Sequence, residues 1–221
     1  MEITYLGHSC FKLKSKAGLV VYIDPFDPAM VGESLPKDVA DVLLISHSHQ
    51  DHSNTEVITG ALNRDKTFVV DKEGEYEIAG VLVTALKTYH DKVDGAERGK
   101  NLVFSVMMDG LNLVHLGDLG HKLSSGAIEK LGSVDVLMTP VGGEYTIETE
   151  TALETVKDIS PGFMIPMHYK TEKSADSLNK LATLSHFLEK NKFPTTPESV
   201  HKIKLEQSSI PEDTQVLLMN A

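Results

Sequence analysis

Short apolar runs separated by Gly, Ser, Pro and Asp occupy most of the first half of the chain. Their β-branched and aromatic residues are typical of strands joined by tight turns. The run at residues 42–45 is apolar at every position, which indicates a strand covered on both faces. The pattern predicts strands at residues 3–6, 11–14, 19–23, 42–45, 68–70, 81–89, 102–108, 111–116, 136–138, 163–167 and 216–219.

Helical patterns enter after the fourth of these strands. Ser53 and Glu56 have the spacing of a capping box, and apolar residues continue at helical spacing from Val57 to Leu62, so we predict a helix that begins near Ser53. Further helices are predicted at residues 123–131, 148–159 and 176–190.

The order of these elements indicates an α/β fold. Strands dominate the first half and then alternate with helices, which favours two sheets sandwiched between outer helices over one parallel sheet. No linker or low-complexity stretch divides the chain, so we expect residues 1–221 to form a single domain.

The charge balance limits the partners. Lys+Arg 21 and Asp+Glu 32 give a net charge of -11, which disfavours binding to nucleic acid and to anionic bilayers. No run approaches the roughly 18 apolar residues of a membrane span, and the start Met1-Glu2-Ile3-Thr4 lacks the pattern of a secretory signal. We therefore expect a cytoplasmic protein without a membrane partner.

Cysteine usage decides which metal chemistry is open to the chain. Cys10 is the only cysteine, which excludes an internal disulfide and a thiolate zinc cluster. A metal site would have to use His and carboxylate ligands, and the chain has 10 histidines.

The strongest chemical signal is the segment His47-Ser48-His49-Gln50-Asp51-His52, which lies between the strand ending at residue 45 and the predicted helix. Residues two apart in an extended segment project to one side, so His47 and His49 can hold one ion together. Asp51 and His52 follow where the chain turns and can reach a second ion. A solvated polar turn is the alternative interpretation.

This HxHxDH pattern resembles the first motif of the metallo-β-lactamase superfamily of metal-dependent hydrolases. The resemblance implies a four-layer αββα sandwich. It assigns a metal-bridging aspartate to Asp118 in Gly117-Asp118, a late histidine to His168, and the remaining ligand to His90 at the end of a predicted strand.

A compact branch of that superfamily, which contains the ascorbate-6-phosphate lactonase-like proteins, is similar in further segments. These are Tyr5-Leu6-Gly7-His8-Ser9, Ile23-Asp24-Pro25-Phe26, Gly142-Gly143 and Pro166-Met167-His168-Tyr169. The likeness covers almost the whole chain and implies a small-molecule substrate.

The resemblance also implies a ligand set for two divalent metal ions. One ion would take His47, His49 and His90, the other Asp51, His52 and His168, with Asp118 as the bridge. Zinc suits these ligands, and manganese or iron are alternatives. A hydroxide between the ions would cleave a small ester, lactone or phosphoester. His49 stands where the diiron oxygen reductases of the superfamily carry Glu, which favours hydrolysis; a metal-binding protein without turnover and a nuclease are the alternatives.

Other residues are open to two interpretations. Asp51 and His121 are candidate catalytic residues, although His121 could equally cap a helix. Asp24 could orient a metal-binding histidine or simply begin a turn, and His8 could line the site or belong to the core. Tyr145, in the loop after Gly142-Gly143, could contact substrate or be a surface residue. The oligomeric state stays open.

Overall fold

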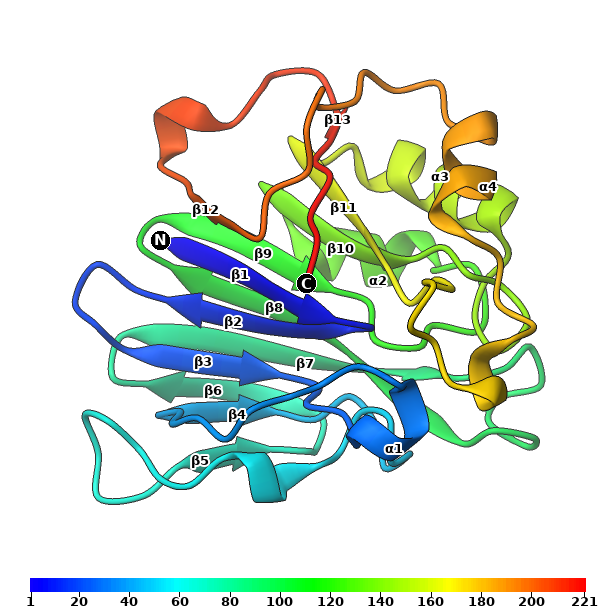
Figure 1. The fold of residues 1–221 in the computed structure, drawn as a ribbon. Coiled ribbons are helices and arrows are strands. Elements are labelled where there is room, and N and C mark those ends of the chain that lie inside the picture. The colour runs from blue at the N-terminus through cyan, green and yellow to red at the C-terminus, as the bar shows by residue number, and fades with distance from the viewer.

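Two β-sheets stacked face to face form the middle of the molecule, and the computed structural model describes residues 1–221 (Figure 1). The first sheet has the strand order β12 (Lys202–Lys204), β1 (Glu2–Gly7), β2 (Cys10–Lys14), β3 (Val20–Ile23), β4 (Val42–Leu44) and β5 (Phe68–Val70). The second has the order β13 (Gln215–Val216), β11 (Phe163–Met167), β10 (Val136–Pro140), β9 (Leu111–His115), β8 (Lys100–Met108), β7 (Val81–Tyr89) and β6 (Gly74–Ile78).

Helices and loops cover the outer face of each sheet. α2 (Ser125–Leu131), α3 (Thr149–Ile159) and α4 (Leu184–Lys190) bury Leu131, Val156 and Phe187 against the second sheet. The first sheet is covered by α1 (Pro28–Val31) and by loops that contribute Phe26 and Leu178. This order of layers confirms the predicted αββα sandwich, with a thin outer layer on the first sheet, because α1 has only four residues. No helix has the length and apolar character needed to cross a membrane.

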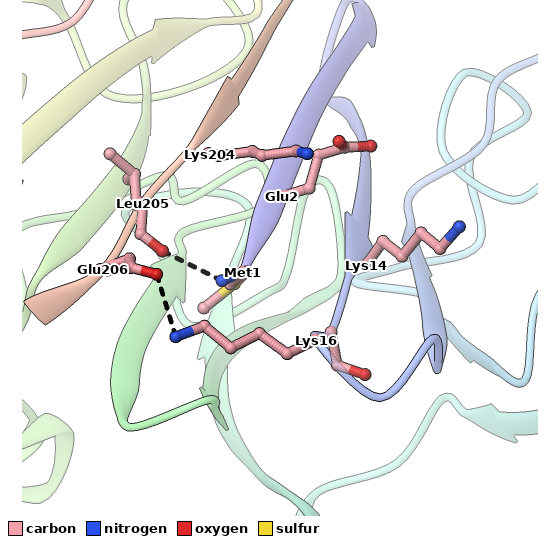
Figure 2. Close-up of a pocket in the computed structure, with 8 residues that line it drawn as sticks. Met1, Glu2, Lys14, Lys16, Lys204, Leu205 and Glu206 are labelled. Carbon is pink, nitrogen blue, oxygen red and sulfur yellow. Dashed lines mark hydrogen bonds and ion pairs between the residues drawn. The ribbon is translucent and has the colours of Figure 1, made fainter.

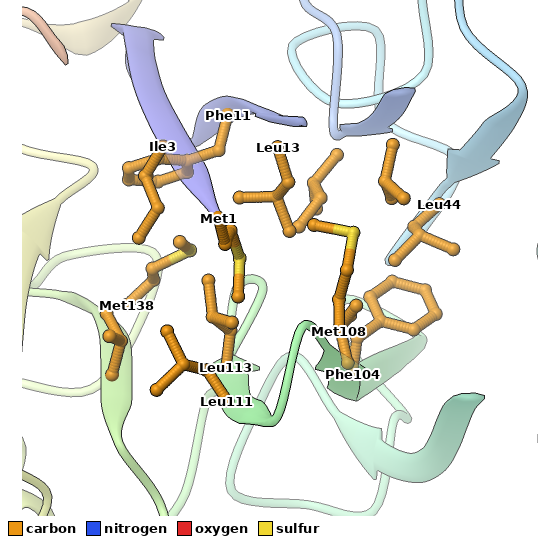
Figure 3. Packing of buried hydrophobic residues seen from close by; sticks show 14 of the residues in the cluster. Met1, Ile3, Phe11, Leu13, Leu44, Phe104, Met108, Leu111, Leu113 and Met138 are labelled. Carbon is orange, nitrogen blue, oxygen red and sulfur yellow. The ribbon is translucent and has the colours of Figure 1, made fainter. Parts of the chain in front are cut away.

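Apolar side chains fill the space between the sheets (Figure 3). Ile3, Phe11 and Leu13 of the first sheet pack in one buried cluster with Phe104 and Leu113 of the second. Burying each such side chain contributes about 1.5–3 kcal/mol relative to leaving it in water. This layer therefore holds the two sheets in a fixed relation, and with them the loops at their ends.

Strand direction gathers the loops of interest at one edge. β3 and β4 are parallel, and β1 runs the same way because two antiparallel pairings through β2 separate it from β3. In the second sheet β7, β9, β10 and β11 share one direction. Figure 1 shows β1 and β3 running toward the side of the molecule that carries α1. The carboxyl ends of parallel strands meet at one edge, where ligand sites of α/β folds are usually found.

The prediction of a helix that begins near Ser53 is wrong. Only a short 3-10 helix, Thr55–Val57, is present. The Ser53 hydroxyl donates to the carbonyls of Ser48 and His49 rather than capping a helix. The following backbone pairs with residues 38–40 instead of with itself, because the Thr59 amide donates to the Asp38 carbonyl at 2.9 Å. A tertiary partner for this β-branched segment overrides its helical spacing.

The prediction of a single helix at residues 176–190 is also wrong, because this segment forms two separate elements. A 3-10 helix, Asp176–Leu178, is followed by a turn, and α4 starts only at Leu184, where the Thr183 side chain accepts from the His186 amide. Leu178 and Leu181 pack under the first sheet, whereas Phe187 packs on the second. The apolar spacing is helical throughout, but its two halves cover different sheets.

Edge strands account for most of the remaining differences. The polar strands β6 and β12 lie outside the predicted set, because alternating exposed residues at a sheet edge carry little apolar signal. Of the strand predicted at residues 216–219, only Val216 belongs to β13, and Met219 makes a single bridge to Val200. Gln207–Ser209 forms one further 3-10 turn.

Candidate functional site

Histidines and aspartates follow the carboxyl ends of six strands that reach the same edge. His8 follows β1, Asp24 follows β3 and the segment containing His47 follows β4 in the first sheet. His90 follows β7, Asp118 lies three residues beyond β9, and His168 follows β11 in the second. The site is therefore built between the sheets, from loops that are distant in sequence.

Three imidazoles gather on one side of this site. His47, His49 and His90 each offer a ring nitrogen within 4.8 Å of the others. The ring of His47 is centred 4.7 Å from that of His49 and 4.8 Å from that of His90. The structure thus brings together the three histidines that the resemblance groups around one ion.

A second group lies beside the first. Asp51, His52 and His168 come together as the resemblance implies, and His8 joins them, with all four ligand atoms within 4.8 Å of one another. The Nε2 atom of His8 lies 3.3 Å from Oδ2 of Asp51, and the rings of His8 and His168 are centred 4.2 Å apart. His8 therefore lines the site rather than packing in a core away from it.

Asp118 lies between the two groups. Its Oδ2 atom is 3.0 Å from Nε2 of His90 and 3.2 Å from Nε2 of His168, and its Oδ1 atom is 3.2 Å from Nε2 of His52. One carboxylate thus contacts histidines from both groups, which is the position a bridging ligand requires.

Several ring nitrogens and one carboxylate oxygen of this cluster are buried without a hydrogen-bond partner. They are Nε2 of His47, His52 and His168, Nδ1 of His90 and His168, and Oδ1 of Asp118. Buried polar atoms without partners are costly and rare. Ligands held at about 2.0–2.1 Å around a tetrahedral ion are themselves about 3.3 Å apart. The spacing of 3.0–3.2 Å around Asp118, without hydrogen-bond geometry, therefore fits the ligand shell of a metal ion.

Hydrogen bonds beneath the cluster fix which ring nitrogens face it. The Asp24 carboxylate accepts from the Ser46 amide at 2.7 Å, from the Ser46 hydroxyl at 2.6 Å and from Nδ1 of His52 at 2.9 Å. Because the Ser46 hydroxyl is a donor to Asp24, it accepts from Nδ1 of His47 at 2.9 Å. Both imidazoles then carry their proton on Nδ1 and leave Nε2 free for a metal.

A buried amide holds the Asp118 turn in the same way. Oδ1 of Asn101 accepts from the Asp118 amide at 2.9 Å, and the Asn101 side chain donates to Thr88 and to the Leu116 carbonyl. Gly117 has a φ of 55°, and a Cβ there would lie 2.3 Å from Oδ1 of Asn101. The glycine before Asp118 is required for this close approach.

Backbone strain marks three of the site positions. His8, Asp24 and His168 have φ values of 52°, 47° and 51°, in the left-handed region that residues with a side chain seldom occupy. Each such residue costs about 1–3 kcal/mol, and such positions cluster at functional sites. The His168 amide donates to the His8 carbonyl at 2.8 Å, and the Tyr5 hydroxyl donates to the same carbonyl at 2.9 Å, so the strained loops support each other.

Burial and neighbouring charges shift the pKa values within the cluster in different directions. Burial and the neighbouring His52 lower the pKa of His47 to about 3, so its imidazole is neutral. Burial alone would lower the pKa of His52, but the carboxylates of Asp118 and Asp24 raise it well above its usual value. Burial opposes ionisation of Asp118, yet His168 and His52 hold the pKa of that carboxyl well below its usual range.

A pocket of about 230 Å³ opens over the cluster. His49, Asp51, His90, Asp118 and His168 line it together with Met30, Arg98, Tyr145, Ser177 and Leu178. The Tyr145 hydroxyl donates to the Ser177 carbonyl at 3.3 Å, and the Arg98 guanidinium lies 4.8 Å from the centre of the Tyr145 ring. Tyr145 is therefore positioned at the mouth of the site.

His121 lies outside this cluster. Its Nε2 atom accepts from the Tyr89 amide at 3.3 Å, and its Nδ1 atom bonds the Lys122 carbonyl at 2.9 Å. The backbone engages both ring nitrogens of His121. The structure therefore does not bring His121 to the histidine cluster, and its imidazole instead holds the loop that contains it. His115 is likewise buried and engaged, to the Ser9 carbonyl and the Gly117 amide.

A larger hollow at the other end of the sandwich belongs to a different region (Figure 2). There the Met1 amine donates to the Leu205 carbonyl at 3.0 Å, and Lys16 pairs with Glu206 at 3.1 Å. The length of β1 separates this hollow from His8 by about 20 Å. It contains no histidine and no part of the cluster.

Sequence reasoning missed the residues that support the cluster. Ser46, Asn101 and Arg98 are single polar residues without a motif, and only their contacts show their roles. Asp91 is a further supporting residue, because its carboxylate accepts from four backbone amides of residues 93–98 and so shapes the loop after His90. Its position directly after His90 was the one available signal.

Comparison with known proteins agrees with this geometry. Residues 2–168 match the model of the beta-lactamase superfamily domain. A UPF0173 metal-dependent hydrolase of Thermoplasma acidophilum is 31% identical over 191 residues, covering 77% of this chain and 84% of that protein. A UPF0173 metal-dependent hydrolase of Carboxydothermus hydrogenoformans is 30% identical over 194 residues, covering 77% and 85%.

Solved structures give the same result. A Thermotoga maritima protein assigned to the Zn-dependent hydrolases of the metallo-β-lactamase superfamily is 32% identical, with a TM-score of 0.77 over 99% of both chains. Igni18, a metallo hydrolase of Ignicoccus hospitalis, is 21% identical and shares the fold, with a TM-score of 0.64 over 98% of this chain and 94% of that one. The chain therefore belongs to the metallo-β-lactamase superfamily and, within it, to the UPF0173 metal-dependent hydrolases.

Proposed function

We propose that this protein hydrolyses a small ester, lactone or phosphoester with the help of two divalent metal ions, for which zinc is the first candidate. The observation that carries the proposal is the set of buried, unpartnered Nε2 atoms of His47, His52 and His168 arranged around the Asp118 carboxylate. Such ions, when bound, lower the pKa of water and polarise the oxygen of the bond to be broken.

The chain's own residues divide the work. His47, His49 and His90 would hold one ion, Asp51, His52 and His168 the other, and Asp118 would serve both. Asp24 holds the proton of His52 on Nδ1, and Ser46 does the same for His47, so that each Nε2 stays available. Asp51 accepts a hydrogen bond from Nε2 of His8, which places a proton-carrying pair at the wall of the site.

A small substrate fits the opening better than a polymer does. The pocket over the cluster is about 230 Å³ and is narrowed by Met30, Tyr145 and Leu178. The net charge of -11 argues against the nuclease alternative. Because the site takes residues from both sheets, we propose that residues 1–221 act as one metallo-hydrolase domain.

The proposal is tested by turnover of the metal-loaded protein on a panel of lactones, phosphodiesters, thioesters and a single-stranded oligonucleotide. We expect hydrolysis of at least one small substrate and none of the oligonucleotide. Metal binding without any turnover would favour the alternative of a metal-binding protein without catalysis, and cleavage of the oligonucleotide alone would favour the nuclease.

Asp118→Ala should lose most of about two bound ions per chain, because the bridging carboxylate serves both. Elemental analysis after mild dialysis measures this directly. His121→Ala is the matched control and should keep its metal, since His121 bonds only the backbone. Full metal occupancy in Asp118→Ala would show that Asp118 is not a metal ligand.

His90→Ala should reduce the bound metal to about one ion and abolish hydrolysis, because it removes one of three ligands of one ion. His8→Ala should keep both ions even where turnover suffers, since the second group retains Asp51, His52 and His168. Metal content and turnover are measured on both variants. The reverse pattern would make His8 the ligand and His90 a loop residue.

Metal affinity should fall as the pH drops. The neighbouring carboxylates raise the pKa of His52, so a metal must displace its proton even near neutral pH, and protons compete more strongly as acidity rises. We expect roughly tenfold weaker binding per pH unit below about pH 7, measured by titration with a competing chelator. Occupancy that stays constant to about pH 4 would show that histidines are not the ligands.

Asp24→Asn should weaken metal binding by about 10–100-fold while the fold is kept, because the amide cannot orient His52 and Ser46 as the carboxylate does. Asparagine also tolerates the left-handed backbone at this position. Asp41→Asn is the control, because Asp41 binds loop amides away from the cluster. Equal metal affinity in the two variants would reduce Asp24 to a turn residue.

A further inference from the structure

A second hollow adjoins the histidine cluster on the side of the second sheet. Its volume is about 690 Å³, and His47 and His49 form part of its wall. The remaining lining comes from the segment after β4, the loop between β5 and β6, the end of β7 and the loop that leads into β8, and it includes Lys72, Lys87, Arg98, Gly99, Lys100 and Leu102. We refer to this hollow as the basic groove.

Four cations line the basic groove, and none of them forms an ion pair. Six other lysines are paired with carboxylates, among them Lys12, Lys122 and Lys190. Lys72, Lys87, Arg98 and Lys100 have no carboxylate oxygen within 4.0 Å, although Asp71 and Glu73 line the same hollow. Unpaired cations that converge on a concave surface focus a positive potential there.

The groove carries a local charge opposite to that of the whole protein. Its four cations and two carboxylates sum to +2, whereas the chain carries -11. The chain has 21 Lys and Arg residues against 32 Asp and Glu residues, and these four cations are gathered from three segments. Lys87 and Lys100 lie on the adjacent antiparallel strands β7 and β8, and Lys72 comes from the loop between β5 and β6.

Arg98 and His49 connect the groove with the histidine cluster, because both residues line the basic groove and the pocket above the cluster. The backbone of Arg98 is held by the loop that follows His90. Its amide donates at 2.7 Å to the carboxylate of Asp91, the neighbour of His90. A small molecule can therefore lie with one end at the cluster and the other among the cations.

We propose that the basic groove binds a doubly charged anionic group, phosphate or dicarboxylate, at the non-reacting end of the substrate. This inference rests on the proposed function, since it assigns a substrate class to the same site. Guanidinium and ammonium groups are the side chains that bind such oxyanions. The shape of the groove selects a small anion whose reactive bond reaches the cluster, rather than a polyanion along an extended basic face.

Binding is measured on the metal-loaded protein with methyl phosphate and, separately, succinate, by following the backbone amide NMR signals of Gly99 and Leu102. The test variant carries Lys87→Gln and Lys100→Gln, two exposed changes outside the metal cluster. The matched control carries Lys157→Gln and Lys192→Gln, which remove the same charge from exposed positions elsewhere. Metal content is measured in all three proteins.

We expect saturable shifts at Gly99 and Leu102, a Kd at least about tenfold weaker in the test variant, and a change of less than about twofold in the control. The anion that binds more tightly shows whether the groove prefers a phosphate or a dicarboxylate group. Equal affinity in the test and control variants would overturn the proposal. The proposal would also be overturned if the test variant lost affinity only for a single-stranded oligonucleotide, because the groove would then be a nucleic-acid surface.

These results are independent of turnover. Anion binding in the groove of a protein that hydrolyses no substrate would retain the anion site and overturn the proposed function. Hydrolysis of neutral and anionic esters at equal KM, with no anion binding at Gly99, would retain the function and overturn the anion site.

Discussion

The carboxylate of Asp118 lies 3.0–3.8 Å from nitrogens of four histidines, and the rest of the site depends on this contact. A buried carboxylate is costly unless positive charge compensates it. His47, His52, His90 and His168 come from both sheets, so their nitrogens surround this carboxylate only when the sheets are stacked. The apolar layer between the sheets therefore does more than stabilise the fold, because it sets the distances on which metal binding relies.

The second constraint is the orientation of the ligands. Strained backbone at His8, Asp24 and His168 turns these side chains toward the cluster, and hydrogen bonds between the loops maintain that strain. Asp24 and Asn101 sit beneath the cluster and fix His52 and Asp118. A site supported in this way is organised before a metal or substrate arrives, which is a requirement of efficient catalysis.

Local and overall charge act at different ranges in this protein. The excess of acidic residues repels polyanions at a distance, while the paired surface lysines contribute little to any site. Close to the cluster, Lys87, Arg98 and Lys100 line the basic groove without a carboxylate partner and make the potential there more positive. The proposed anion site rests on this difference between the local charge of the groove and the overall charge of the chain.

The sequence by itself determined most of the strands, the layered α/β class and most of the cluster, because His47, His49 and the residues after strand ends carry local signals. It could not determine whether the segment after Ser53 forms a helix or pairs with residues 38–40, since that choice depends on a distant partner. The placement of His8 beside Asp51 and the gathering of Arg98 with Lys87 were likewise decided only by the tertiary structure. Short-range spacing fixes which way a side chain can point, whereas contacts between loops of two sheets are fixed by how the sheets pack.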